Sequence, residues 1–141
     1  MIADPAIYIA CDTTGMDQCR EWAALANSHG QGLKLGLEFF AYHGPAGVKQ
    51  IQDDNPDIRL FLDLKLHDIP NTVGAAIRSV CERVTPGYIT VHASGGEAMM
   101  RAARENCPDH TRVLGVTVLT SLDADTLASV GQDDHHQAQV V

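Results

Sequence analysis

The chain has 141 residues, of which 45% are hydrophobic and 20% are charged, a balance typical of a single globular domain with an apolar core. The formal net charge of −8 argues against a nucleic-acid-binding protein, which normally carries a basic face, but not against a phosphorylated small substrate held by local cations. The sequence shows neither a signal-peptide pattern nor an apolar run of about 18 residues, so we expect a cytoplasmic protein that does not enter a membrane.

Short β-rich segments alternate with longer helical patterns along the chain. In chain order we predict a strand at 7–12, a helix at 15–30, a strand at 32–37, a helix at 45–54, a strand at 58–65, a helix at 71–84, a strand at 88–92, a helix at 96–106, a strand at 112–119 and a helix at 123–130. This alternation predicts βαβ units and a parallel sheet. It fits either a small doubly wound sheet or part of a barrel, and composition does not choose between the two.

Ionisable residues of the first three predicted strands fall on one face of the sheet, because side chains alternate along a strand. Lys34 lies opposite a row of leucines, Asp63 and Lys65 share a face, and Asp12 closes the first strand on the corresponding face. Ordinary solvated ion pairs are the alternative for any one of them. Parallel sheets are normally covered on both faces, however, so four such charges together favour a functional site, and barrel enzymes place such sites at the C-terminal strand ends.

The segment 63–72 reads DLKLHDIPNT, a D-x-K-x-x-D-I-P-x-T pattern at the end of the third predicted strand. This motif closely resembles the signature of the orotidine 5′-phosphate decarboxylase family. Related Mg²⁺-dependent sugar-phosphate decarboxylases and synthases share D-x-K-x-x-D, but the continuation Ile-Pro-Asn-Thr favours the nucleotide enzyme. Supporting blocks stand in the order expected for the family and extend the resemblance over residues 7–131: Asp12, 34–40 (KLGLEFF), 91–96 (VHASGG) and 116–121 (VTVLTS).

The resemblance implies an α/β fold, a (β/α)8 TIM barrel, of which residues 1–141 would supply one partial domain with strands 1–5 and their helices. In the family, elements that grip the substrate phosphate follow the fifth strand. We therefore expect the chain alone to lack the phosphate-binding half, to expose strand edges, and to be poorly active or prone to aggregation.

The resemblance also implies roles for the charged residues. Lys65 would donate a proton to the substrate carbon, and Asp63 would lie against the substrate carboxylate. Lys34 would link the ribose hydroxyls to these charges, and Asp12 would bind the ribose. Asp68 would help to hold Lys65 charged and positioned, so the expected catalytic group comprises Lys65, Asp63, Asp68 and Lys34.

Other residues of the matching blocks are expected to line the substrate. They are Leu64, Leu66, His67, Ile69, Pro70, Asn71, Thr72 and Thr120. The family pattern further implies a homodimer in which Asp68 and Thr72 reach into the partner's site. His67 is expected to be a structural or exposed residue rather than an acid–base group.

The chemistry explains why such residues are needed. Loss of CO2 from C6 of orotidine 5′-phosphate (OMP) leaves an electron pair in an in-plane orbital that the ring π system cannot accept. The family uses no metal or organic cofactor, so we expect neither here, and preorganised charge must stabilise the transition state. A Lys65 ammonium aimed at C6 would stabilise the carbanion and then protonate it to form UMP, while Asp63 and Asp68 hold it in place.

Several conspicuous features are not expected to take part. The cysteines, at positions 11, 19, 81 and 107, have no metal-ligand spacing, which favours buried, reduced thiols. His92 is expected to be a hydrogen-bonded residue at the barrel end rather than a metal ligand. The Gly95-Gly96 turn has the composition of a phosphate cradle, but the family binds phosphate elsewhere. The acidic stretch 133–136 is expected to be a solvated loop.

Two alternative functions stay open on the sequence alone. One is a Mg²⁺-dependent sugar-phosphate decarboxylase or synthase of the same suprafamily, which EDTA would inhibit. The other, from a different class, is a non-catalytic barrel fragment that acts as a dimerisation module.

Overall fold

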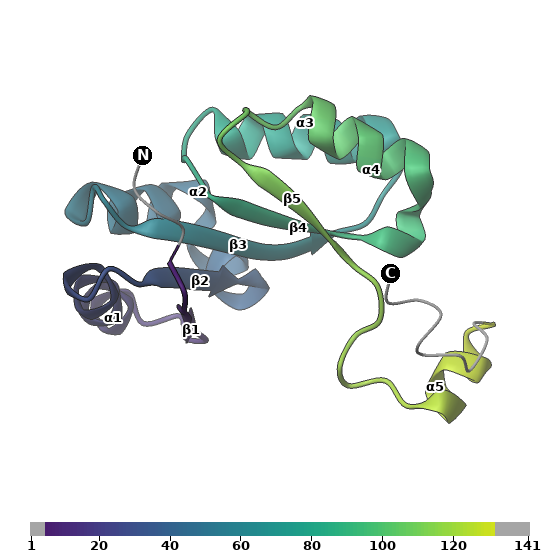
Figure 1. The fold of residues 1–141 in the computed structure, drawn as a ribbon, viewed down its shortest axis with the longest axis horizontal. Helices are drawn as coiled ribbons and strands as arrows, with labels where there is room; N and C mark the ends of the chain where they lie inside the picture. Colours follow the sequence, from purple (N-terminus) through teal and green to yellow (C-terminus); the bar gives the residue numbers. More distant parts are fainter. Residues whose placement is uncertain (1–4, 132–141) are drawn as a thin grey trace.

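The computed structural model describes residues 5–131, in which strands and helices alternate (Figure 1). The strands are β1 (Tyr8–Cys11), β2 (Gly32–Gly36), β3 (Arg59–Leu66), β4 (Tyr88–His92) and β5 (Arg112–Val116). The helices are α1 (Met16–Ser28), α2 (Leu37–Asp54), α3 (Pro70–Cys81), the short 3₁₀ helix η1 (Ala93–Gly95), α4 (Gly96–Glu105) and α5 (Ala124–Ser129). Within this part of the chain no helix is both long and apolar enough to cross a membrane.

The strands form one parallel sheet in the order β1-β2-β3-β4-β5. Each strand thus pairs with its neighbours in sequence. A doubly wound sheet would reverse its strand order at a switch point, whereas a barrel adds each new strand on the same side. The barrel type of winding is therefore the one found, and β1 and β5 are the edges of the sheet within residues 5–131.

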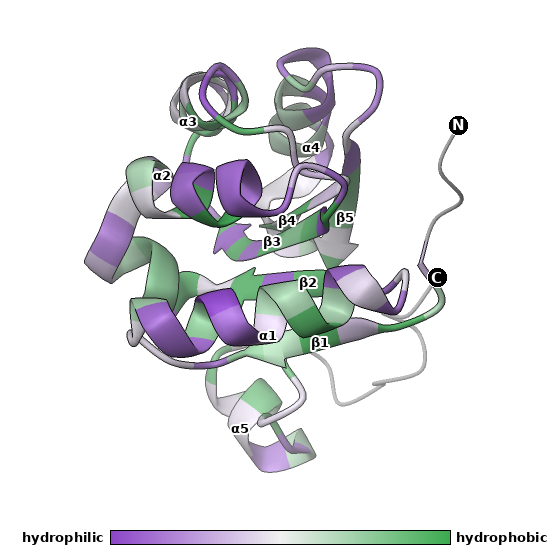
Figure 2. Cartoon of the chain, turned by 90° about the vertical axis from the view of Figure 1, so that its left-hand side faces the viewer, coloured by the Kyte–Doolittle hydropathy of each residue, from purple (hydrophilic) through white to green (hydrophobic). Residues whose placement is uncertain are grey.

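One face of the sheet carries the hydrophobic core. Its strand residues are fully buried and alternate along the chain, as Leu33 and Leu35 do in β2 and Leu60 and Leu62 do in β3. Helices α1 to α4 cover this face (Figure 2), and Phe39 of α2 is the largest side chain buried there. Burying one such side chain stabilises the fold by about 1.5–3 kcal/mol, so this layer holds the strands in their order.

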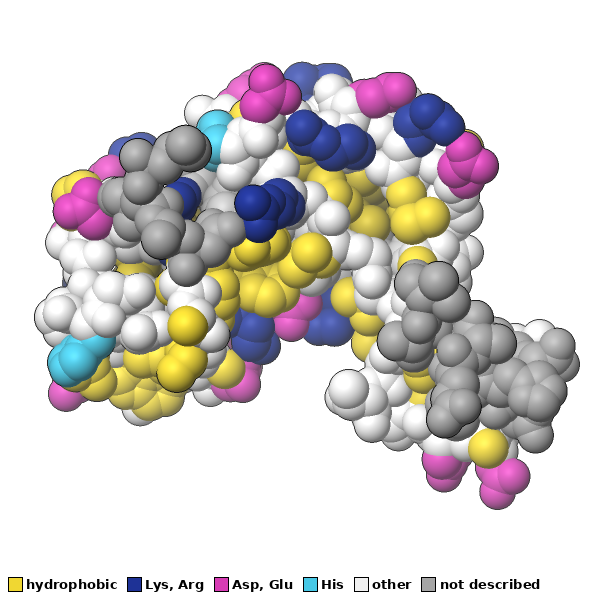
Figure 3. Space-filling model, viewed as in Figure 1, with side chains coloured by type: hydrophobic (Ala, Val, Ile, Leu, Met, Phe, Trp, Pro, Cys, Tyr) yellow, Lys and Arg dark blue, Asp and Glu magenta, His cyan; other side chains and the backbone are white. Residues whose placement is uncertain are grey.

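Aromatic side chains fill the N-terminal half of the opposite face. The rings of Tyr8, Phe61 and Tyr88 lie with their centroids 5.6 to 5.8 Å apart, and Arg112 lies over the Tyr88 ring. Figure 3 shows hydrophobic side chains gathered over the middle of the molecule and a hollow between its body and α5. The C-terminal half of the same face carries the charged residues described below.

Helix α2 differs most from the prediction, which placed a helix only at 45–54. It begins at Leu37, directly after Gly36, and kinks at Gly44, where φ is 62° and ψ is −170°. Only glycine adopts this left-handed backbone at little cost, and Pro45 then starts the second segment as prolines often do. The sequence prediction identified the second segment and missed the first, which buries Phe39.

The remaining boundaries shift by a few residues. Strand β5 ends at Val116 rather than at 119, and α3 ends at Cys81 although Val84, buried beyond it, continues the predicted apolar stripe. Helix α5 begins after Asp123, whose carboxylate accepts the backbone N–H of Thr126 at 2.8 Å. The acidic stretch 133–136 lies outside the described residues.

Candidate active site

Four side chains of alternating charge lie in a row at the C-terminal ends of β1, β2 and β3. Lys34 Nζ is 3.9 Å from Asp12 Oδ1 and 3.4 Å from Asp63 Oδ2. Lys65 Nζ lies 2.8 Å from the same Asp63 oxygen. The structure therefore brings together the four residues that strand alternation placed on one face, and we call Asp12, Lys34, Asp63 and Lys65 the charge row.

Exposure differs along the charge row and makes Asp63 its centre. The Asp63 side chain is 13% exposed, against 26% for Lys34, 37% for Lys65 and 70% for Asp12. Gly36, which pairs with Asp63 in the sheet, places no side chain between Asp12 and Asp63. One nearly buried carboxylate thus holds two ammonium groups, and the outermost ion pair is the most open to water.

The pKa of Asp63 lies below its usual range. Burial by itself raises the pKa of this carboxyl, because the charged form loses hydration. Hydrogen bonds from Lys65 and Thr90, together with the positive charges of Lys65 and Lys34, outweigh burial and lower it. Asp63 is therefore ionised over the physiological pH range and supplies a fixed negative charge beside the Lys65 ammonium.

The backbone of β3 is irregular where the motif carries its charges. Lys65 has a φ of 48°, and the pairing of β3 with β4 shifts register between Leu62 and Leu66. A left-handed conformation at a residue other than glycine costs of order 1–3 kcal/mol, and such strain clusters at functional sites. Regular side-chain alternation along β3 is therefore interrupted at Lys65.

Thr90 of β4 belongs to this site although the sequence analysis did not name it. Its hydroxyl donates to Asp63 Oδ1 at 3.0 Å and accepts the backbone N–H of Lys65 at 2.9 Å. The side chain is neutral, so the pattern of ionisable residues does not identify it. The available signal was its position between Tyr88 and His92, which puts it on the inward face of β4.

The second aspartate of the motif lies away from the charge row. Asp68 is exposed and its carboxylate accepts the backbone N–H of Ile69 at 2.7 Å. Among residues 5–131 it makes no ion pair with Lys65. The expected hold of Asp68 on Lys65 is thus not present within one chain.

The other residues predicted to line the substrate are divided between the buried core and the exposed surface. Leu64 is 3% exposed and is part of the core on the helix-covered face, so its side chain is not available to a substrate. Leu66 packs partly against that core. The remaining predicted residues are exposed and lie between β3 and α3, in the first turn of α3, or after β5: His67, Ile69, Pro70, Asn71, Thr72 and Thr120.

His92 packs against His67 at the end of β4, with ring centroids 5.3 Å apart. Within the described residues this ring contact replaces the hydrogen bond that we expected for His92. Burial lowers the pKa of His92 from its ordinary 6.5, and the nearby His67 and Lys65 lower it further. The lowered pKa disfavours a protonated His92, which would add a positive charge near Lys65.

A pH dependence of stability follows from His92. Because its pKa is lower in the folded than in the unfolded chain, its contribution is present above pH 6.5 and is lost as the pH falls through the folded pKa. We expect the urea midpoint to fall between pH 7.5 and 5.5, and to fall less in His92→Asn. The exposed His110→Asn serves as control, and equal pH slopes for all three proteins would contradict the assignment.

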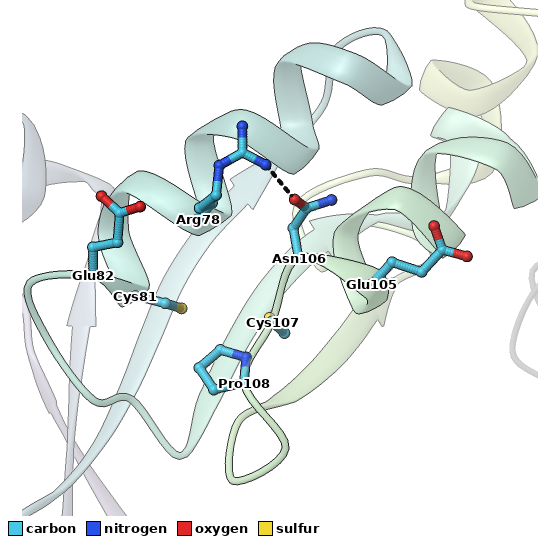
Figure 4. A pocket seen from close by; sticks show the side chains of 7 residues that line it. All are labelled: Arg78, Cys81, Glu82, Glu105, Asn106, Cys107 and Pro108. Atoms are coloured by element: carbon cyan, nitrogen blue, oxygen red, sulfur yellow. Dashed lines mark hydrogen bonds between the residues drawn. The ribbon is translucent and has the colours of Figure 1, made fainter.

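A separate cavity of about 320 Å³ lies at the C-terminal ends of α3 and α4 (Figure 4). Its lining includes Cys81 and Cys107, and Arg78 donates to Asn106 across it at 2.6 Å. A hydrogen bond between the thiols raises the pKa of Cys81 and lowers that of Cys107. All four cysteines are free, as expected, but Cys81 and Cys107 are only half-buried.

No group of three or more His, Cys, Asp or Glu side chains within residues 5–131 is arranged to hold a metal ion.

Comparison with known proteins links this geometry to one family. Residues 5–141 match the family model described as "Orotidine 5′-phosphate decarboxylase / HUMPS family". The orotidine 5′-phosphate decarboxylase of Novosphingobium aromaticivorans is 46% identical over 125 residues, which are 89% of this chain and 54% of that protein. That of Thermobifida fusca is 47% identical over 125 residues, 89% of this chain and 52% of that protein.

Solved structures agree with the sequence comparison. The crystal structure of orotidine 5′-phosphate decarboxylase from Lactobacillus acidophilus superposes with a TM-score of 0.79 at 29% identity and covers 92% of this chain and 59% of that one. The five-stranded sheet is thus part of a TIM-barrel fold. The chain spans about half the length of the curated relatives it matches.

Proposed function

Because the chain belongs to the orotidine 5′-phosphate decarboxylase / HUMPS family, we propose that it carries the reacting end of an orotidine 5′-phosphate decarboxylase, a lyase of pyrimidine biosynthesis. The observation that carries the proposal is the charge row, whose Lys65 and Asp63 belong to the D-x-K-x-x-D-I-P-x-T motif and lie 2.8 Å apart. The match over residues 5–141 supports treating residues 1–141 as part of one barrel domain. The proposed location is the cytoplasm.

In the proposed reaction the bond between C6 and the carboxylate of OMP breaks, CO2 leaves, and the electron pair remains on C6. The Lys65 ammonium, held by Asp63, stabilises that charge and transfers its proton to C6, which gives UMP. Fixed charges stabilise such a carbanion without reorganising during the reaction, so no electron-accepting cofactor is required. Asp63 would also lie against the substrate carboxylate, and Lys34 and Asp12 would bind the ribose hydroxyls.

A sugar-phosphate decarboxylase or synthase is the less favoured function, although the family includes such enzymes. The continuation Ile-Pro-Asn-Thr follows Asp68, and the relatives named above are orotidine 5′-phosphate decarboxylases. EDTA is expected to leave turnover unchanged, whereas a Mg²⁺-dependent enzyme would lose it.

The direct test joins this chain to the C-terminal part of a relative that lies beyond the matched region. We define the completed chain as this chain joined in frame to the remaining C-terminal segment of the N. aromaticivorans relative. It is expected to convert OMP to UMP in vitro, while the 141-residue chain alone shows little turnover because phosphate-binding elements are expected after the fifth strand. A soluble, folded completed chain without OMP turnover would contradict the proposed function.

We also propose a homodimer in which Asp68 and Thr72 approach the partner's substrate. Both side chains are exposed, and the intervening Ile69 is 65% exposed, an apolar group well suited to an interface. Asp68, which makes no ion pair with Lys65 within residues 5–131, would then face the partner's Lys65.

Self-association can be tested on the 141-residue chain by sedimentation velocity. Ile69→Asp is expected to weaken dimerisation at least about tenfold, because it buries an unpaired charge in the contact. Leu25→Asp changes a residue of similar exposure (54%) on α1 and is expected to leave the dimer intact. A monomeric parent chain, or equal weakening by both variants, would refute this contact.

A further inference from the structure

The strand pairing around the motif leaves one β4 residue opposite three β3 residues. Leu62 pairs with Ile89 and Leu66 pairs with Val91, so residues 63–65 of β3 face only Thr90. In a regular parallel ladder the N–H of a residue such as Lys65 would donate to a backbone carbonyl of the neighbouring strand. Here it donates to the Thr90 side chain at 2.9 Å instead.

The Thr90 hydroxyl both donates and accepts a hydrogen bond. A hydroxyl has one hydrogen to donate and lone pairs that accept. The hydrogen goes to Asp63 Oδ1 at 3.0 Å, while Lys34 and Lys65 contact the other oxygen, Oδ2. Thr90 is 3% exposed, so water does not readily replace it. One side chain therefore orients the Asp63 carboxylate and also holds the left-handed backbone of Lys65.

We propose that Thr90 is a positioning residue of the charge row, whose hydroxyl fixes the Asp63 carboxylate relative to the Lys65 backbone so that the Lys65 ammonium is held in one place. It acts through these two residues and need not touch a substrate. The geometric role stands on the contacts just described, and only its consequence for turnover rests on the proposed function.

Thr111 provides the contrast that separates positioning from ordinary packing. It is also buried, at 1% exposure, and its hydroxyl donates to the backbone oxygen of Pro86 at 2.7 Å. Replacing either threonine by valine removes a buried hydroxyl at nearly constant volume. Both changes cost stability, but only the change at Thr90 removes a hydrogen bond from Asp63.

The first test measures the titration of the Asp63 carboxyl by carbon-detected NMR in the 141-residue chain. In Thr90→Val the Asp63 pKa is expected to rise, because a hydrogen bond that favours the charged form is lost. Thr90→Ser keeps the hydroxyl and is expected to restore the parent value, and Thr111→Val is expected to leave it unchanged. An unchanged Asp63 pKa in Thr90→Val, or an equal rise in Thr111→Val, overturns the proposal.

The parent chain itself provides a measurement that does not depend on a folded variant. The Lys65 amide and the Thr90 Cβ resonances are expected to shift with the midpoint of the Asp63 titration, since one hydroxyl joins all three groups. If these chemical shifts do not change at the midpoint of the Asp63 titration, the proposal is overturned even if Thr90→Val does not fold.

Turnover of the completed chain separates this inference from the proposed function. Thr90→Val is expected to lower kcat about tenfold, the size expected for one lost hydrogen bond to a charged group, with little change in KM. Thr90→Ser is expected to recover most of the loss. If the parent completed chain shows no OMP turnover, the proposed function fails, while the NMR titrations still decide the role of Thr90.

Discussion

Replacing Lys65 by alanine is expected to lower OMP turnover by the completed chain by about 10⁴-fold or more, while the product UMP still binds. The variant loses both the ammonium that would stabilise charge at C6 and the proton that C6 would receive. Each of these effects typically contributes about 10²–10⁴-fold. Groups elsewhere in the site would still bind the ribose and phosphate, so affinity should change much less than kcat.

Single-turnover measurements and calorimetric titration with UMP would check this result. Lys49→Ala is the matched control, because Lys49 is a lysine on α2 that pairs with Asp53 and does not belong to the charge row. Near-normal turnover by a folded Lys65→Ala variant would remove Lys65 from the proposed mechanism. Loss of UMP binding together with turnover would instead point to a structural role.

Asp63→Asn is expected to lower kcat by about 10²–10³-fold, the second largest effect. The substitution keeps the shape of the side chain but removes the negative charge that lies 3.4 Å from Lys34 Nζ and 2.8 Å from Lys65 Nζ. Two ammonium groups then share a neutral neighbour and repel each other, so Lys65 is no longer held in one position.

The same substitution tests how the charge row contributes to stability. Asp63 has a lower pKa folded than unfolded, so its contribution is present above the ordinary carboxyl pKa and is lost as the pH falls through the folded value. Asp63→Asn should flatten the acid limb of the stability profile measured by urea unfolding at a series of pH values. Unchanged kcat in a folded Asp63→Asn variant would contradict its proposed role.

Much of the fold was predictable because its signals are local. The alternation of apolar and charged residues in β2 and β3 placed Lys34 and Asp63 on one face, and the structure has them 3.4 Å apart. The first segment of α2 was missed because its entry and exit depend on Gly36 and on the left-handed Gly44, which short windows of sequence do not separate from a loop. Apolar periodicity identified the strands more reliably than it identified their ends.

The sequence by itself determined the order of strands and helices, the residues of the charge row and the motif that identifies the family, because periodicity and residue type are properties of neighbouring positions. Only the tertiary structure decided how β3 and β4 pair, and with it the left-handed Lys65 and the two hydrogen bonds of Thr90. Thr90 lies 25 residues from Lys65 and 27 from Asp63. Contacts at that separation depend on strand register, which packing of the whole sheet selects, so no local pattern in the sequence contains them.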